Sequence, residues 1–257
     1  MHILLTNDDG IFAPGLSAIY KKLADIGDVT VVAPANSQSG SSHSITFNQP
    51  VVGNEVDING LFTGFSIQGS PTDCVKIAAM QLCDKPIDLV VAGINSGANA
   101  GINIYYSGTV AAAMEAAFLK IPAVAMSLAY EFEETMDFET AAGYCAKILK
   151  KLMPVKSGCV INVNIPQLSA GPPKGVRVVP QSIEGFHEHY TREKNEHGQT
   201  IFQLVGGLHR DDSEKNGPTD SASLAEGYIT ISALAPGMTD YEKTRRLEQK
   251  HWETGIV

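Results

Sequence analysis

The chain opens with a short apolar run followed by a helical repeat. Residues 2–6 are mostly apolar, and a polar turn at 7–10 follows them. Leu16, Ile19 and Leu23 then recur at the spacing of one helix face. Residues 28–33 form a second apolar run. This order predicts a strand, a helix and a parallel strand joined by a right-handed crossover.

The same alternation continues to about residue 165. Ser70 and Asp73 have the spacing of a capping box, which predicts a helix start at this point. The further predicted elements are a helix over 70–82, a strand over 87–92, a loop over 93–107, a helix over 108–120, a strand over 121–127, a helix over 137–152 and a strand over 159–165. We therefore expect an α/β protein with a mostly parallel sheet and helices on both faces.

The last third of the chain has a different pattern. Residues 175–205 read as strands with polar turns, with a hairpin tip near 195–198. A strand is predicted over 228–234 and a terminal helix over 239–252. Without a clear linker or repeat, we expect one domain over 1–257. It comprises a core of about 1–170, a hairpin extension of about 175–210, and a C-terminal strand and helix of about 227–255.

Composition and charge exclude several classes of protein. The chain of 257 residues carries 28 acidic and 19 basic side chains, for a formal net charge of -9. This balance does not favour a nucleic-acid polymer as partner. The most apolar segment, 109–130, contains Glu115, Lys120 and Pro122, so no membrane association is expected. The absence of a signal-like start and four scattered cysteines favour a cytoplasmic protein.

Three polar loops fall at the ends of predicted strands, where doubly wound sheets bind ligands. The first places Asp8 and Asp9 side by side directly after a buried strand. A divalent cation would relieve the repulsion between two such carboxylates. A solvated Asp-Gly turn explains the same residues.

The second loop, 34–46, is rich in serine, and the third, 93–107, alternates glycine with asparagine. The serines suit either a flexible linker or a shell of hydroxyls around a charged ligand. The third loop ends at Ser107, Gly108 and Thr109, directly before a predicted helix. A serine N-cap alone would explain these residues, but the hydroxyls and free N–H groups together favour a phosphate site.

Common signatures of other enzymes do not occur. The sequence contains no GxxxxGK[ST], no GxGxxG after a strand, no GxSxG and no HExxH motif. These absences weaken a P-loop, nicotinamide, serine-hydrolase or zinc-protease interpretation.

Five motifs occur in a fixed order within residues 2–128. They are Leu-Leu-Thr-Asn-Asp-Asp-Gly at 4–10 with Ala-Pro-Gly at 13–15, Ser-Gly at 39–40, Gly-Ser-Pro-Thr-Asp-Cys-Val at 69–75, Gly-Ile-Asn-Ser-Gly-Ala-Asn at 93–99 and Tyr-Ser-Gly-Thr-Val at 106–110. In sequence and in order these motifs resemble the survival protein SurE family, whose members are metal-dependent nucleoside-monophosphate phosphatases.

The resemblance implies a Rossmann-like core and one divalent ion per subunit, Mg²⁺ or Mn²⁺. Its ligands would be four oxygen donors: Asp8, Asp9, Ser39 and Asn95. It also implies that the hairpin and the C-terminal segment exchange between subunits in a homodimer or homotetramer. One departure is Ile102-Asn103, which replaces an acidic pair common in the family.

The hypothesis for the reaction is hydrolysis of nucleoside 5′- and 3′-monophosphates by metal-activated water. Ser107, Gly108 and Thr109 would bind the phosphate, Asn99 would orient it, and Asp9 would act as general base. Asp8 completes the predicted catalytic pair. One alternative is an aspartyl-phosphate intermediate, and another is a non-catalytic sensor that binds metal and nucleotide without turnover.

Overall fold

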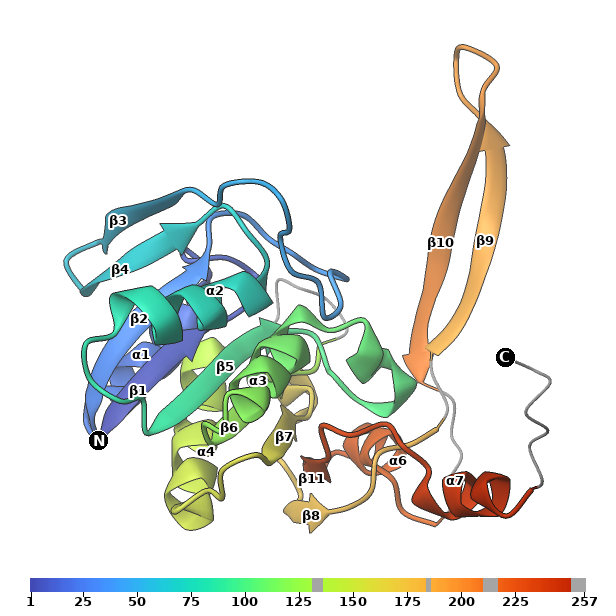
Figure 1. Ribbon diagram of the computed structural model, residues 1–257. Coiled ribbons are helices and arrows are strands. Elements are labelled where there is room, and N and C mark those ends of the chain that lie inside the picture. The colour runs from blue at the N-terminus through green and yellow to red at the C-terminus, as the bar shows by residue number, and fades with distance from the viewer. Residues whose placement is uncertain (131–135, 184–185, 210–216, 251–257) are drawn as a thin grey trace.

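The computed structural model describes residues 1–130, 136–183, 186–209 and 217–250. A nine-stranded sheet forms its centre, and a two-stranded hairpin stands away from that sheet (Figure 1). In spatial order the strands of the sheet are β3 (Gly53–Ile58), β4 (Phe62–Ile67), β2 (Asp28–Pro34), β1 (His2–Thr6), β5 (Leu89–Ser96), β6 (Ala123–Leu128), β7 (Val160–Ile165), β11 (Ile229–Leu234) and β8 (Val176–Val178).

The six strands from β4 to β7 are all parallel, and antiparallel pairing occurs only toward the two edges. Counted along the parallel strands alone, their order is 3-2-1-4-5-6, which is the order of the Rossmann fold. The strand order therefore reverses between β1 and β5. The predicted α/β class with a mostly parallel sheet is confirmed.

Helices cover both faces of the sheet because the parallel strands are apolar on both sides. Within β1, Ile3 and Leu5 pack into one core and Leu4 packs into the other. The first core lies under α1 (Pro14–Leu23) and α4 (Phe138–Leu152). The second lies under α2 (Pro71–Ile77) and α3 (Gly108–Phe118), on the opposite face (Figure 1).

Shorter helical segments join these layers. They are η1 (Ala78–Leu82), η2 (Gly101–Tyr105), η4 (Leu168–Ala170) and α6 (Asp220–Ala225). The predicted capping box of α2 is present, since Ser70 and Asp73 satisfy each other's backbone N–H groups. Within the described ranges, no helix is long and apolar enough to cross a bilayer.

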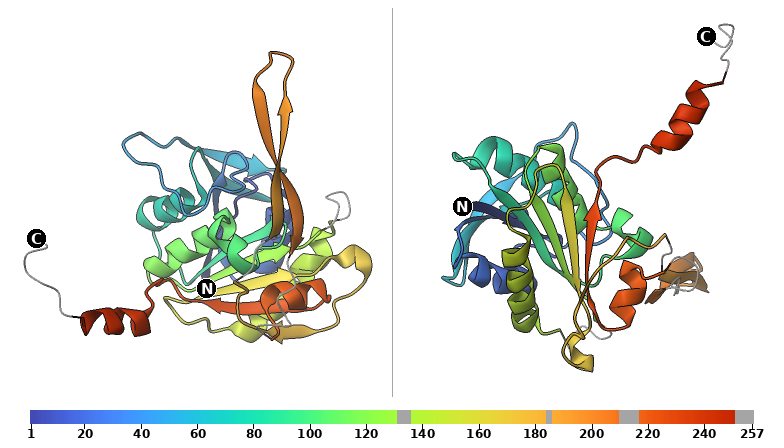
Figure 2. Two further views of the ribbon diagram at one scale, coloured as in Figure 1. Left: turned by 90° about the vertical axis from the view of Figure 1, so that its right-hand side faces the viewer. Right: turned by 90° about the horizontal axis from the view of Figure 1, so that it is seen from below.

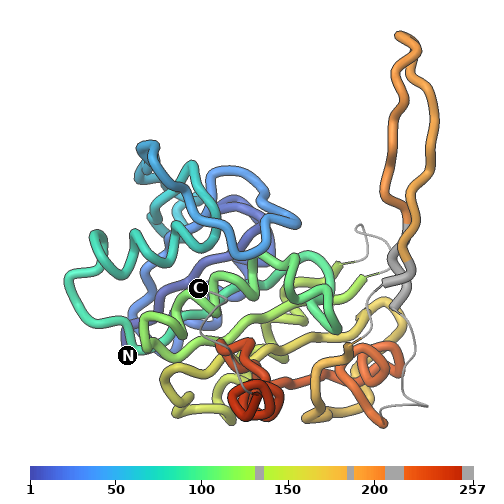
Figure 3. The backbone as a smooth tube through the Cα atoms, turned by 45° about the vertical axis from the view of Figure 1, so that its right-hand side comes forward, coloured from blue at the N-terminus to red at the C-terminus, as the bar shows by residue number. Residues whose placement is uncertain are grey.

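The hairpin formed by β9 (Phe186–Lys194) and β10 (Thr200–His209) projects from the body of the molecule (Figure 3). Its side chains include exposed Tyr190, Phe202 and Leu204. The last helix, α7 (Tyr241–Glu248), buries none of its residues and extends away from the sheet (Figure 2). Such exposed apolar surface is typical of segments that contact another chain.

The structure corrects several predicted boundaries. Strand β5 continues to Ser96, past the predicted end at residue 92, because a bulge in its pairing with β6 lets the strand resume at Asn95. The β3–β4 hairpin and α6 were not expected. The terminal helix ends at Glu248, and residues 251–255 of the predicted C-terminal segment lie outside the described residues, as do 184–185 and 210 of the predicted hairpin.

Candidate active site

The three polar loops meet at the carboxyl edge of the sheet, beside the reversal of strand order. They enclose one cavity of about 620 Å³, which also reaches the hairpin. The predicted site residues that line the cavity are Asp8, Ser39, Asn95, Asn99 and Ser107. The other three, Asp9, Gly108 and Thr109, are not among its lining residues and lie beside them. Asp8 and Ser107, which are 99 positions apart in the chain, thus share one site because parallel strands end at one edge.

Asp8 is a buried carboxylate in the lining of the cavity. Only 4% of its surface is exposed, and its Oδ1 accepts a hydrogen bond from the Thr109 hydroxyl. The pKa of Asp8 is raised to about 6: burial is the main cause, the Thr109 hydrogen bond opposes the rise, and the charge of Asp9 adds to it. A buried carboxylate beside a second carboxylate is a place where a bound cation would be stabilised.

Asp9 and Asn95 are held by the end of β5. The Ser96 N–H donates to Asp9 Oδ2 at 2.8 Å, and Asn95 Nδ2 donates to the Gly97 carbonyl at 2.8 Å. Gly97 has φ of +114°, a conformation that favours glycine. With its nitrogen engaged in this way, Asn95 has its amide oxygen available as a ligand.

The serine-rich loop packs against the β1 turn. The Gln38 N–H donates to the Asp8 carbonyl at 2.7 Å, and Ser39 Oγ lies 3.0 Å from Ser37 Oγ. Ser41 Oγ is buried and, among the described residues, has no hydrogen-bond partner. Polar atoms left in that state usually face an ion, a water or a ligand.

The N-terminus of α3 closes the other side of the site. Ser107 is its N-cap, because Ser107 Oγ accepts from the Val110 N–H at 3.0 Å, and the same residue lines the cavity. The N-cap interpretation of this serine is therefore confirmed, and its role in binding phosphate stays a prediction. Thr109 is fully buried and its hydroxyl is directed to Asp8. A Cβ at Gly108 would lie 2.8 Å from Ser41 Oγ, so only glycine fits between the loop and Asp8.

Two asparagines that sequence reasoning missed hold Asn99. Asn164 Oδ1 accepts from the Asn99 N–H at 2.8 Å, and Nδ2 of Asn162 and of Asn164 donates to the Asn99 carbonyl at 2.8 and 3.0 Å. Asn99 Nδ2 in turn donates to Ser127 Oγ at 2.8 Å. The only sequence signal was a pair of alternating asparagines in an otherwise apolar strand, at 162 and 164. This network fixes the third loop from β6 and β7.

Asp220 was also missed, and it holds the next residues of the same loop. Its carboxylate accepts from the backbone N–H groups of Gly101, Ser182 and Ser221 at 2.8–3.2 Å. Burial raises the pKa of this carboxyl, and these hydrogen bonds oppose the rise. The carboxylate therefore joins the cavity loop to the C-terminal third of the chain.

The residues present fit a hard divalent cation. The predicted donors are two carboxylates, one hydroxyl and one amide, and all four are oxygen ligands. In the part of the chain that the structure describes, no group of three or more His, Cys, Asp or Glu side chains could hold a metal. A thiolate- or imidazole-bound ion is therefore not what this donor set favours. The buried Ser41 hydroxyl beside Asp8 also fits a site with a bound species.

The chain is similar to proteins of one family. The model of a family described as "Survival protein SurE" matches residues 3–188. A Syntrophobacter fumaroxidans protein named 5′-nucleotidase SurE is 41% identical over 245 residues, covering 94% of this chain and 96% of its own. A Rhodopirellula baltica protein of the same name is 39% identical, with coverage of 93% and 94%.

A solved structure shows the same fold. The crystal structure of the SurE protein from Aquifex aeolicus has a TM-score of 0.81 and 33% identity, and the match covers 96% of this chain and 98% of that one. The motifs of the three loops, the strand order and all three comparisons lead to one conclusion: the chain belongs to the survival protein SurE family.

Proposed function

We propose that the protein is a phosphoric monoester hydrolase that converts nucleoside 5′- and 3′-monophosphates to nucleoside and phosphate. Relatives that are 36–41% identical carry the name 5′-nucleotidase SurE. The observation that carries the proposal is the buried Asp8 facing a cavity that also contains the N-cap of α3. This arrangement combines a cation site with an anion site, as phosphoryl transfer requires.

One Mg²⁺ or Mn²⁺ per subunit would be held by Asp8, Asp9, Ser39 and Asn95. When bound, the ion would withdraw charge from the phosphoryl group and lower the pKa of a nearby water. Thr109 supports this role by fixing the Asp8 carboxylate with its hydroxyl. Ser96 supports it by fixing Asp9 through a backbone N–H.

The remaining cavity residues would act on the phosphate and on the proton. Ser107 and the Gly108 N–H, at the start of α3, would bind the non-bridging oxygens as their charge redistributes in the transition state. Asn99, fixed by its neighbours, would orient the phosphate. Asp9, which is less buried than Asp8, would accept the proton of the attacking water.

The rest of the cavity has room for a nucleoside. Its lining includes Tyr106 and, from the hairpin, Tyr190 and Leu204. Aromatic and apolar side chains of this kind suit the face of a base.

The exposed hairpin and α7 support the proposal that subunits exchange these segments in a homodimer or homotetramer. We place the protein in the cytoplasm.

Release of inorganic phosphate tests this function. A panel of nucleoside 5′- and 3′-monophosphates and a generic aryl phosphate would be assayed with Mg²⁺, Mn²⁺ or EDTA. We expect release that needs a metal and that is faster for nucleotides than for the aryl phosphate. Nucleotide binding by calorimetry, with no phosphate release under any metal, would instead identify a non-catalytic sensor.

A further inference from the structure

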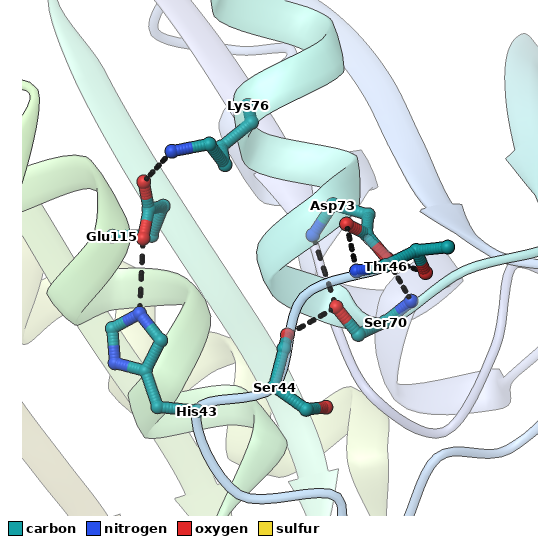
Figure 4. Close-up of polar contacts among 7 residues, drawn as sticks. All are labelled: His43, Ser44, Thr46, Ser70, Asp73, Lys76 and Glu115. Atoms are coloured by element: carbon teal, nitrogen blue, oxygen red, sulfur yellow. Dashed lines mark hydrogen bonds and ion pairs between the residues drawn. The ribbon is translucent and has the colours of Figure 1, made fainter. Parts of the chain in front are cut away.

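A buried carboxylate lies two helical turns into α3, beyond the N-terminal turn that we propose binds the phosphate. Glu115 is 5% exposed, and both of its oxygens are paired. His43 Nε2 lies 2.9 Å from Oε2, and Lys76 Nζ lies 2.9 Å from Oε1 (Figure 4). Burying a carboxylate is costly unless it is paired in this way. The mechanism proposed above gives Glu115 no part.

The partner that matters for the site is His43, because it belongs to the serine-rich loop. It follows Ser39 by four residues, and its side chain is 32% exposed. Its ring also stacks on Phe118, with centroids 5.2 Å apart and an interplanar angle of 14°. Phe118 is one helical turn beyond Glu115, so α3 holds the same imidazole by a hydrogen bond and by a ring face.

Further anchors flank this contact. On the far side of His43, the N–H and hydroxyl of Thr46 donate to the Asp73 carboxylate at 3.0 and 2.7 Å (Figure 4). On the near side, the Ser42 N–H donates to the Tyr106 carbonyl at 3.0 Å, directly before α3. The loop that carries Ser39 is therefore attached to α3, whose first turn we propose binds the phosphate.

We propose that His43 and Glu115 are positioning residues for the hydrolytic site. Their contact sets the place of the Ser39 loop relative to the N-terminus of α3, and Lys76 supplies the charge that keeps Glu115 paired. Neither side chain touches the cavity, so neither acts on substrate. This inference rests on the proposed function, since it assumes that Ser39 is a metal ligand.

Two properties of His43→Ala test the proposal: hydrogen exchange of residues 36–46 in the metal-free protein, and the Mn²⁺ concentration that gives half-maximal phosphate release. We expect faster exchange in this loop and an increase in the Mn²⁺ requirement of about tenfold, as for other residues that orient metal ligands. His43→Gln should restore most of both, because a glutamine nitrogen can reach the place of Nε2.

A matched control and a pairwise test make the design sharper. Lys21→Ala removes an exposed ion pair of 2.5 Å with Glu139, between α1 and α4, and should change neither readout. Glu115→Ala, which removes the hydrogen-bond partner of His43, should reproduce the effect of His43→Ala. The double variant should be little worse than either single variant, because both remove one contact.

Three results would overturn the proposal: unchanged loop exchange in His43→Ala, faster exchange with an unchanged Mn²⁺ requirement, or a glutamine variant no better than alanine. Failure of the proposed function would look different. In that case the wild-type protein would release no phosphate with any metal. Calorimetric Mn²⁺ binding to wild type and His43→Ala would then replace the activity readout, and equal affinities, or no Mn²⁺ binding by wild type, would overturn the positioning role.

Discussion

Gly108 packs directly against Asp8. A Cβ built on Gly108 would lie 2.8 Å from the Asp8 Cβ and 3.0 Å from its Oδ2. The first residue of α3 therefore has no side chain because the carboxylate occupies that space. This contact also brings the N-terminus of the helix, with its partial positive charge, against the most buried acid of the cavity.

Gly108→Ala should impair the site without unfolding the protein. The added methyl group must displace Asp8 or Ser41, and a displacement of about 1 Å at a reacting centre can lower activity by roughly tenfold to a hundredfold. Phosphate release and circular dichroism would be measured together. Gly143→Ala is the control, because Gly143 lies in α4 with nothing within 4 Å of its Cβ position. It should keep full activity and gain about 0.5–1 kcal/mol of stability.

Asp8→Asn should stabilise the metal-free protein at alkaline pH while abolishing metal-dependent activity. The folded pKa of Asp8 is about 6, against an ordinary value of 3.8 for an aspartate. A raised carboxyl pKa means that the ionised group opposes folding above pH 6, and that this cost disappears as the pH falls to 4. We expect a gain of about 1–3 kcal/mol in the free energy of unfolding at pH 8.

Urea unfolding in EDTA at pH 8 and pH 4 measures this effect. The stabilisation should be present at pH 8 and absent at pH 4. Equal stability of wild type and variant at pH 8 would show that burying the ionised Asp8 carboxylate does not destabilise the fold. Because protons and cations compete for the same oxygens, Mn²⁺ binding to wild type should also weaken as the pH falls below about 6.

Asp220→Ala should destabilise the fold and loosen the third loop. The change leaves the N–H groups of Gly101, Ser182 and Ser221 without their acceptor, which should cost about 2–4 kcal/mol. The exposed N-cap Asp137 of α4 is the comparison, and its alanine variant should lose only about 1 kcal/mol. Thermal unfolding of both variants checks the difference. Equal losses would mean that Asp220 is not a buried anchor.

The sequence predicted the parts of the site that follow strands. Asp8, Asn95 and Ser107 could be placed at one edge because strand ends of a parallel sheet share an edge. The hydroxyl of Thr109 was expected on phosphate, and the structure directs it to Asp8. Sequence spacing alone could not distinguish these two partners of Thr109, because Asp8 and the proposed phosphate site both lie beside the first turn of α3.

The residues that sequence reasoning missed act across long separations. Asn164 holds Asn99 from 65 positions away, and Asp220 holds Gly101 from 119 positions away. Nothing local distinguishes such anchors from ordinary polar residues. The β3–β4 hairpin was missed for a different reason: β3 is mostly exposed and lacks the apolar run of a core strand.

The position of a bound metal tests the central claim most directly. Crystals grown with Mn²⁺ and a nucleoside monophosphate would be measured at the manganese absorption edge. We predict one anomalous peak per subunit, contacted by oxygens of Asp8, Asp9, Ser39 and Asn95, with the phosphate beside Ser107. A peak at other residues, or a phosphate bound at this edge of the sheet with no metal beside it, would contradict the proposed site.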